Sequence, residues 1–140
     1  MIYATASATS LDYVRNLGAA LVIDYRTKRF EDCVADVDDV IDLVGGDTTN
    51  RSWDIVWPGG TIVSTVVPDI ADHAPAYVIG QFFNMGCDGG ELARLADDVA
   101  ARRLASPQLE TCAFDALPDA IERIKCGRLV GKIVARIASY

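Results

Sequence analysis

Short apolar runs alternate along this chain with segments whose apolar residues recur at helical spacing. Leu21–Ile23 and Val40–Val44 are almost continuously apolar, whereas Leu11, Val14 and Leu17 would share one face of a helix. A strand that is apolar at nearly every position is typical of a sheet covered on both sides. The alternation of such strands with helices therefore predicts an α/β fold with a doubly wound parallel sheet.

The same patterns predict where each element lies. We expect strands over residues 2–5, 21–23, 40–44, 61–67, 77–83, 110–114 and 132–137. We expect helices that begin near Ser10, Thr27, Asp47 or Thr48, Asp88 and Asp115, with Asp88 and Asp115 as capping residues. Trp53, Val56 and Trp57 would share one face of the third helix, and Leu92 and Leu95 of the fourth would face the core. Pro58-Gly59-Gly60 predicts a turn and residues 68–75 a loop. No repeat or linker interrupts the chain, so we expect a single domain over 1–140.

Charge and composition exclude several classes of protein. The 140 residues include 20 acidic and 13 basic side chains, a net charge of -7, which would repel the phosphates of nucleic acids and anionic membranes. No apolar run approaches the ~18 residues of a membrane span, and the N-terminus lacks the pattern of a signal peptide. Four scattered cysteines and one histidine do not form a zinc motif, so we expect free thiols in a cytoplasmic protein without a metal.

The motifs resemble, in order, those of a known family. LDYVRNLGAALVIDYR, residues 11–26, looks like the second helix and third strand of the zinc-free, quinone-oxidoreductase-like branch of the medium-chain dehydrogenases/reductases. VIDLVGGDT, WPGGTIVS, the Phe82-Phe83 pair, DGGEL and the final GKIVARI match the same branch at similar spacing. The resemblance covers essentially the whole chain. It implies a nucleotide-binding domain of an alcohol dehydrogenase-like oxidoreductase.

The resemblance also implies that parts of the family's fold lie outside this sequence. A G-x-G-x-x-G turn, which receives the cofactor pyrophosphate after the first strand, is not present. We therefore expect an incomplete Rossmann-type sheet without its first strand, with a core over 1–107 and a strand-helix-strand over 108–140. That last segment packs in the family toward a catalytic domain. In the strand order 3-2-1-4-5-6 the missing strand leaves a gap, which closes if the two halves slide together or if another chain supplies pairing. We expect a homodimer or another chain that completes the sheet.

A first group of candidate residues would contact the adenosine phosphate of NADP(H). The first strand ends at Ala6-Ser7 without the acidic residue that binds the ribose of NAD. By resemblance to family members that use NADPH, Ser7, Tyr25 and Arg26 are assigned to the 2′-phosphate. The alternative is that Ser7–Ser10 is only a helix-capping turn and that Tyr25 and Arg26 are ordinary surface residues.

A second group follows the later strands, at the sheet edge where ligands bind in open α/β folds. The candidate cofactor contacts are Val44, Gly45, Gly46, Ser64, Thr65, Val66, Phe82, Phe83 and Lys132. The alternatives are a plain strand-to-helix turn for the glycines, one ring on each sheet face for the phenylalanines, and an unspecific exposed lysine. No catalytic residue is assigned, because no general acid or nucleophile triad can be assembled from the sequence.

Two functions follow from these interpretations. In the first, the chain is a fragment or truncated relative of an NADPH-dependent enzyme that delivers hydride to quinones or α,β-unsaturated carbonyls, and it is inactive alone. In the second, it is a non-enzymatic dimerising or partner-binding module that kept the fold and lost the cofactor.

Overall fold

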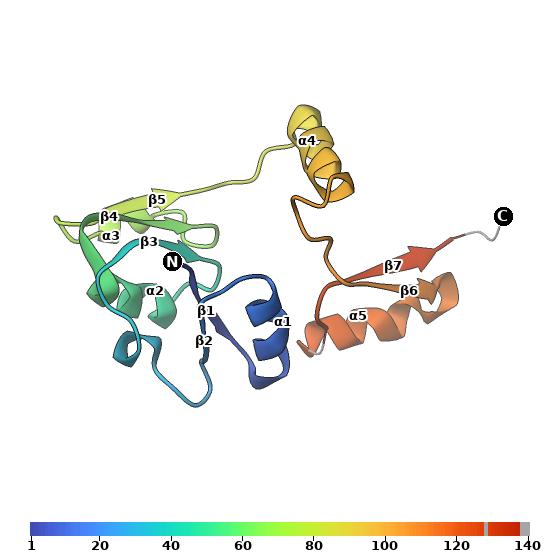
Figure 1. Cartoon of the computed structure of the whole chain (residues 1–140), viewed down its shortest axis with the longest axis horizontal. Helices are drawn as coiled ribbons and strands as arrows, with labels where there is room; N and C mark the ends of the chain where they lie inside the picture. The colour runs from blue at the N-terminus through green and yellow to red at the C-terminus, as the bar shows by residue number, and fades with distance from the viewer. Residues whose placement is uncertain (128, 138–140) are drawn as a thin grey trace. The chain divides into compact units, whose positions relative to one another are not determined.

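The computed structural model describes residues 1–127 and 129–137 of the chain (Figure 1). The chain divides into two compact units, Met1–Cys87 and Asp88–Tyr140. The expected division into a core over 1–107 and a C-terminal segment over 108–140 stays a prediction.

The first unit holds five strands and three short helices. The strands are β1 (Tyr3–Ala6), β2 (Leu21–Asp24), β3 (Val37–Asp42), β4 (Val56–Ser64) and β5 (Ile79–Phe82). The helices are α1 (Leu11–Asn16), α2 (Asp47–Ser52) and α3 (Ile70–His73), and single 3₁₀ turns cover Ala8–Ser10, Phe30–Asp32 and Trp53–Ile55. The second unit holds α4 (Gly89–Ala100), β6 (Leu109–Ala113), a 3₁₀ turn (Phe114–Ala116), α5 (Leu117–Lys125) and β7 (Lys132–Arg136).

The first unit contains two separate parallel sheets. β1 pairs only with β2, and β3, β4 and β5 form a second sheet in that order. Figure 1 shows the β1–β2 pair standing apart from β3–β5. The prediction of an incomplete Rossmann-type α/β fold is therefore confirmed. The break in the sheet lies where the missing strand was expected.

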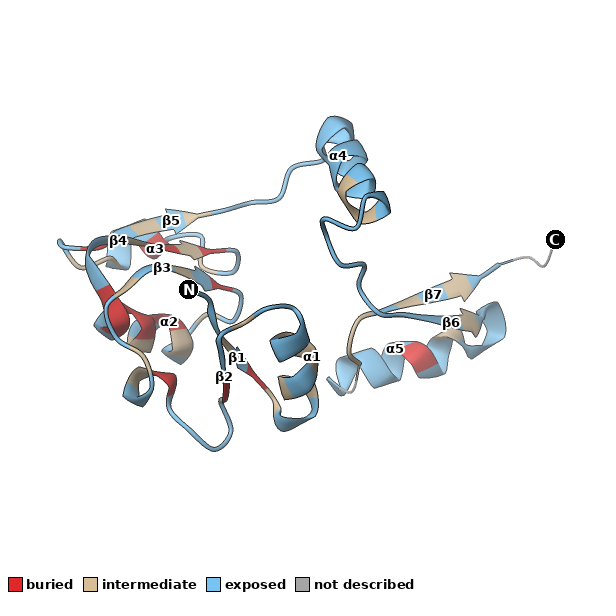
Figure 2. Ribbon diagram, viewed as in Figure 1, coloured by how far each residue is buried: buried red, intermediate tan, exposed pale blue. Residues whose placement is uncertain are grey.

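One face of the β3–β5 sheet carries the main core. Ile62 and Ile70 are fully buried and pack with Trp53 of the 3₁₀ turn after α2, Val56 at the start of β4 and Val78 just before β5. Figure 2 shows the buried residues concentrated on this side, around α2 and α3. On the opposite face Ile41 is 74% exposed, so within the first unit the sheet is covered on one side and not on both.

Residues 56–60 differ from the expectation. Trp53, Val56 and Trp57 have helical spacing, but α2 ends at Ser52 and Val56 already pairs with Val37 of β3. Pro58 follows Trp57, and a proline disfavours helical dihedrals in the residue before it. The next register pair is Asp39 with Thr61, so the turn residues form an irregularity inside β4.

Three smaller expectations about helices are also corrected. The segment after Thr27 forms only a 3₁₀ turn at Phe30–Asp32, and the expected loop over 68–75 contains α3. Asp115 does not cap α5, whose N-cap residue is Ala116 without a side-chain bond. The cap at Asp88 is confirmed, since its Oδ1 accepts from the amides of Gly90 and Glu91 at 2.8 and 3.1 Å.

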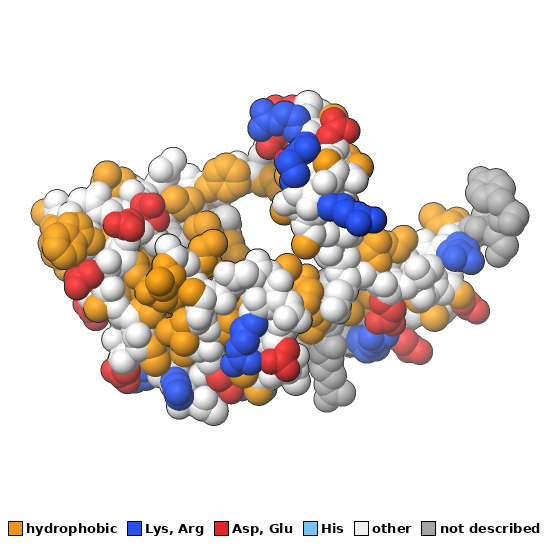
Figure 3. All heavy atoms as spheres, in the orientation of Figure 1, with side chains coloured by type: hydrophobic (Ala, Val, Ile, Leu, Met, Phe, Trp, Pro, Cys, Tyr) orange, Lys and Arg blue, Asp and Glu red, His pale blue; other side chains and the backbone are white. Residues whose placement is uncertain are grey.

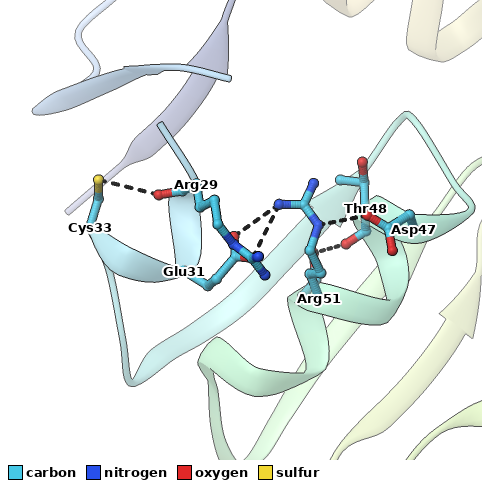
Figure 4. Close-up of polar contacts among 7 residues, drawn as sticks. Arg29, Glu31, Cys33, Asp47, Thr48 and Arg51 are labelled. Carbon is cyan, nitrogen blue, oxygen red and sulfur yellow. Dashed lines mark hydrogen bonds and ion pairs between the residues drawn. The ribbon is translucent and has the colours of Figure 1, made fainter. Parts of the chain in front are cut away.

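An arginine joins the crossover after β2 to helix α2 (Figure 4). Arg51 Nη1 lies 3.0 Å from Glu31 Oε2, and its Nε lies 3.0 Å from Asp47 Oδ2. Its guanidinium also stacks 4.8 Å from the ring centroid of buried Phe30. Burial alone would raise the pKa of Glu31, but hydrogen bonds that include those from Arg29 and Arg51 hold it below its usual range. This cluster fixes the crossover against α2.

The second unit is small and largely exposed. β6 and β7 form a parallel pair, and Arg123 of α5 makes a bidentate pair with Glu110 of β6 at 2.6 and 2.8 Å. Leu92 and Leu95 of α4, which were expected to face a core, are 68% and 44% exposed. Among the helices of residues 1–127 and 129–137, none has the length and hydropathy that a bilayer crossing requires.

Candidate functional site

Two turns meet at the carboxyl edge of the β3–β5 sheet. Gly45 and Gly46 follow β3 with φ values of 82° and 58°, a left-handed conformation that favours glycine. A side chain at Gly45 would lie 3.2 Å from Cγ2 of Val66, in the turn after β4. The two turns therefore pack against each other, as expected for the strand ends of an open α/β sheet.

A buried carboxylate organises the first turn. Asp42, the last residue of β3, is only 3% exposed. Its Oδ1 accepts hydrogen bonds from the amides of Val44 and Gly45, both at 2.9 Å. Its Oδ2 accepts from the hydroxyls of Thr49 at 2.6 Å and Ser64 at 3.1 Å. One side chain thus links β3, the glycine turn, α2 and β4.

These contacts set the ionisation of the carboxylate. Burial by itself would raise the pKa of Asp42, because desolvation disfavours the charged form. The hydrogen bonds donated by Thr49, Gly45, Val44 and Ser64 outweigh this effect and hold the pKa below the ordinary value of an aspartate. Asp42 is therefore a charged, fully partnered structural group.

Ser64 organises the second turn in the same way. It is fully buried, and its hydroxyl accepts from the amides of Val66 at 3.2 Å and Val67 at 3.1 Å. The Thr65 amide donates to the carbonyl of Asp42 at 3.1 Å, and the Phe83 amide donates to the carbonyl of Ser64 at 2.9 Å. The Ser64 side chain supports the turn from inside and presents no surface to a ligand.

The remaining polar groups of this edge are mainly hydrogen-bond acceptors. The amides of Val44, Gly45, Thr65, Val66 and Val67 are used internally, whereas no bond is found among the described residues for those of Leu43 and Gly46. Among the described residues, nothing donates to four carbonyl oxygens, those of Val44, Gly45, Thr65 and Val66. Val44 is 70% and Val66 46% exposed, so the turns face solvent. The edge suits a ligand that donates N–H groups, such as a carboxamide, better than an anion.

The predicted phosphate contacts lie at the corresponding edge of the other sheet. Ser7 directly follows β1, and Tyr25 and Arg26 directly follow β2; the Tyr25 amide donates to the Ala6 carbonyl at 3.3 Å. The Arg26 guanidinium lies 5.8 Å from the ring centroid of Tyr25, and both side chains are exposed. The hydroxyl of Ser7, the residue before the 3₁₀ turn, lies 3.0 Å from that of Thr9 within the turn. The structure therefore brings these three residues to one strand-end region.

The last three candidates are placed differently. Phe82 ends β5 and packs, partly buried, against the core, whereas Phe83 is 53% exposed beside Ser64. The two rings thus occupy different environments. Lys132 begins β7 in the second unit, where its amide donates to the Gln108 carbonyl at 2.8 Å. Its predicted role in cofactor binding stays a prediction.

Two site residues were missed by sequence reasoning. Asp42 and Thr49 are both buried polar residues that shape the glycine turn. The signal for Asp42 was present, because an aspartate interrupts the apolar run of residues 40–44. A buried carboxylate needs partners, and the amides of the following turn and the hydroxyls of Thr49 in α2 and Ser64 in β4 supply them.

A shallow pocket of about 120 Å³ lies beside the glycine turn, lined by Gly46, Thr49, Asn50, Trp53, Val67, Ile70 and His73. His73 Nε2 lies 3.0 Å from Asp69 Oδ2, and both side chains are exposed. Across residues 1–127 and 129–137, no three His, Cys, Asp or Glu side chains converge as metal ligands.

Comparison with known proteins places the chain in a family. Residues 17–134 match the family model described as zinc-binding dehydrogenase. The chain belongs to this family. The predicted relation to the medium-chain dehydrogenases is thereby confirmed, and with it an oxidoreductase domain of a nicotinamide-cofactor family.

Similar proteins are named as reductases. The chain is 26% identical over 136 residues to a 2-methylene-furan-3-one reductase of Solanum lycopersicum, covering 95% of this chain and 32% of that protein. It is 27% identical to the quinone oxidoreductase of Coxiella burnetii, with a TM-score of 0.84, covering 99% of this chain and 45% of that one. A quinone oxidoreductase of Pseudomonas syringae shares the fold at 20% identity and a TM-score of 0.73, with 96% and 48% covered. The chain therefore spans less than half the length of these relatives.

Proposed function

We propose that the chain is the adenosine- and nicotinamide-binding part of an NADPH-dependent reductase of quinones or α,β-unsaturated carbonyls. The observation that carries this proposal is the acceptor-lined carboxyl edge at Val44, Gly45, Thr65 and Val66. A nicotinamide carboxamide offers two N–H donors that suit such carbonyls. The names of the quinone and furanone reductases support the substrate class.

The other strand-end region supports NADPH rather than NADH. β1 ends without an acidic side chain, and Arg26 after β2 provides an exposed guanidinium for a 2′-phosphate. Ser7 and Tyr25 add hydroxyl groups at the same edge. Bound NADPH would supply hydride to the substrate carbon, and the residues of this chain would only hold and orient the cofactor.

The chain alone should be inactive or nearly so. Its sequence has no G-x-G-x-x-G turn to bind the pyrophosphate. Each lost charge-assisted contact weakens binding by about 1.5–3 kcal/mol, so the loss of two lowers affinity by roughly 10² or more. Four free thiols, Cys33, Cys87, Cys112 and Cys126, suit a reducing compartment such as the cytosol.

Titration of the purified chain with NADPH, followed by cofactor fluorescence and with NADH as control, tests this proposal. We expect weak saturable binding that prefers NADPH. Arg26→Gln should reduce NADPH affinity about 10-fold or more, through loss of one charged contact, and leave NADH binding unchanged. Arg15→Gln, at an exposed arginine of α1, is the matched control. Failure of NADPH to bind at millimolar concentration, or turnover of a quinone by the pure chain, would contradict the proposal.

A second candidate function is a non-enzymatic partner-binding module. Exposed apolar side chains favour it, because Ile41, Leu43 and Val44 are 65–74% exposed at the end of β3. Figure 3 shows hydrophobic side chains gathered on the visible face of the part that spans Met1–Cys87. Absence of cofactor binding together with complex formation would support this function over the first.

A further inference from the structure

The two ends of the proposed cofactor site lie on different segments of the first unit. The adenosine-phosphate end is at Tyr25 and Arg26, directly after β2, and the nicotinamide end includes Gly45 and Gly46, between β3 and α2. A dinucleotide gains from contacts at both ends only if the protein holds them at the separation that the ligand spans. The contacts that set this separation therefore belong to the site.

Hydrogen bonds tie the adenosine-phosphate end to the 3₁₀ turn over residues 30–32. Asp24 Oδ1 accepts from the amide of Arg26 at 3.0 Å. The Asp24 carbonyl accepts from the amides of Thr27 and Lys28 at 3.1 and 3.0 Å. The chain then reaches the 3₁₀ turn after a single further residue. The position of Arg26 consequently depends on where that turn is held.

Helix α2 carries the nicotinamide end in a similar way. Gly46 is the residue before α2, and its carbonyl accepts from the Asn50 amide at 3.2 Å. Arg51 follows in the same helix, and its Nε lies 3.0 Å from Oδ2 of Asp47, the first residue of α2. This contact is an ion pair without the alignment of a hydrogen bond. Arg51 is thus attached to the part of α2 that directly continues the glycine turn.

Arg51 also reaches the 3₁₀ turn on the other segment (Figure 4). Its Nη1 donates to Oε1 and Oε2 of Glu31 at 3.2 and 3.0 Å, and its guanidinium lies 4.8 Å from the ring centroid of Phe30. The side chains of Arg51 and Glu31 are 29% and 12% exposed, so water screens this pair less than a fully exposed one. A planar guanidinium that pairs with a carboxylate and stacks on a ring fixes orientation as well as distance.

The apolar cluster below this pair does not fix the register by itself. Phe30 packs with Ile23 of β2 and with Ile55, in the 3₁₀ turn after α2. Apolar burial is not directional, so the cluster holds the two segments together without setting how far one slides along the other. The ion pair between Arg51 and Glu31 supplies that constraint.

We propose that Arg51 is a positioning residue for the cofactor, which sets the separation between the Arg26 end and the Gly45 end of the site. This inference rests on the proposed function, because it concerns the same two ends. Arg51 acts through the 3₁₀ turn at residues 30–32 and through the start of α2, and no contact with the ligand is assigned to it.

NMR titration of the purified chain with the whole cofactor and with its two halves tests the inference. The ligands are NADPH, adenosine 2′,5′-bisphosphate and reduced nicotinamide mononucleotide. The product of the two fragment dissociation constants, divided by that of NADPH, is an effective concentration that measures the gain from joining the halves. Arg51→Gln should lower this effective concentration about 10-fold and change each fragment affinity by less than about twofold. Retained fragment affinities also show that the variant is folded.

Arg29→Gln is the matched control. Arg29 Nη2 pairs with the same Glu31 carboxylate at 2.6 Å, but both residues belong to the segment after β2. The control removes an equal charge and a partner of Glu31 without breaking the link to α2, so the effective concentration should stay unchanged. Glu31→Gln weakens the link from its other side. The double variant with Arg51→Gln should be no worse than Arg51→Gln alone, because both substitutions remove one interaction.

Several results would overturn the inference. One is an unchanged effective concentration in Arg51→Gln, and another is an equal fall in Arg29→Gln. A loss of both fragment affinities in parallel with that of NADPH would show a structural role and no positioning role. If the unaltered chain binds NADPH no better than the fragments, the inference fails and the site itself stands. Binding of none of the three ligands to the unaltered chain would contradict the proposed function, and the inference with it.

Discussion

A single aspartate determines which hydrogen-bonding groups the candidate site presents. Asp42 takes up the amides of Val44 and Gly45 and, through Ser64, supports a turn that takes up two more. Four backbone carbonyls of the two turns accept no hydrogen bond from the described residues and remain at the surface of the edge. Many anion sites of α/β proteins direct backbone N–H donors at the ligand from a helix N-terminus. This edge instead exposes carbonyl oxygens, which are hydrogen-bond acceptors. Substitution of Asp42 should therefore change both stability and the character of the edge.

We expect Asp42→Asn to lower the free energy of unfolding by about 2–3 kcal/mol. Asparagine offers a single acceptor oxygen in place of two and adds an N–H₂ group that meets the donors of Thr49 or Ser64. Urea unfolding measures the loss. Asp39→Asn removes a nearby exposed carboxylate and should change stability by less than about 0.5 kcal/mol. Equal effects of the two substitutions would contradict the role of Asp42.

Acidification should destabilise the first unit through the same residue. Its folded-state pKa lies below the ordinary value, so the unfolded chain binds the proton more readily. The stabilisation is complete above the unfolded pKa of about 3.9 and is lost as pH falls through the lower, folded pKa. Urea unfolding at a series of pH values between neutral and about 3 should show this decline. Asp42→Asn should have a shallower slope below about pH 4, and parallel slopes for the two proteins would be evidence against it.

At the scale of elements, close backbone approach limits where side chains fit. A Cβ at Gly80 in β5 would lie 2.7 Å from the carbonyl oxygen of Ile70 and 3.1 Å from Cβ of Ala74. At Gly60 in β4 it would clash with the Asp38 carbonyl. These glycines permit α3 to lie against β5 and the irregular part of β4 to lie against β3.

Gly80→Ala should therefore separate α3 from β5 and lower the free energy of unfolding by about 1–3 kcal/mol. Gly86→Ala is the matched control, because that position has open space and no positive φ. The control should be neutral or slightly stabilising. Thermal unfolding of both variants provides the comparison. A loss of similar size at Gly86 would mean that packing against α3 is not the cause.

The elements also indicate what sequence patterns can predict. β2 and β7 lie within one residue of the expected ranges, because short apolar runs rich in valine and isoleucine, such as 21–23, favour a strand. Val56 and Trp57 were predicted in a helix because local spacing cannot register the pairing of Val56 with Val37, 19 residues away. Strand pairing of this kind is a tertiary effect that overrides local periodicity.

The sequence predicted where the candidate site lies but not which backbone groups, N–H or C=O, it exposes. Glycines and hydroxyl residues after strands indicated the carboxyl edge, and the structure brings Gly45 and Val66 into contact there. Whether an amide or a carbonyl faces outward depends on which group Asp42 and Ser64 bind inside. Their burial follows from packing by α2 and β4, which no local pattern specifies.

At the scale of the whole molecule, the sheet is divided although its surrounding elements are in place. β1 and β2 pair correctly with each other, β3 to β5 do the same, and a shared apolar cluster holds the two sheets in one unit. The incomplete sheet was expected from the missing motif. The division into a β1–β2 pair and a β3–β5 sheet could be located only from the observed strand pairing.

The pairing of β1 only with β2, and of β3 only with β4, also bears on how this chain behaves when purified alone. A strand edge without a partner is a template for unspecific β-association between molecules. Solutions of the isolated chain should therefore lose protein to aggregates as its concentration rises.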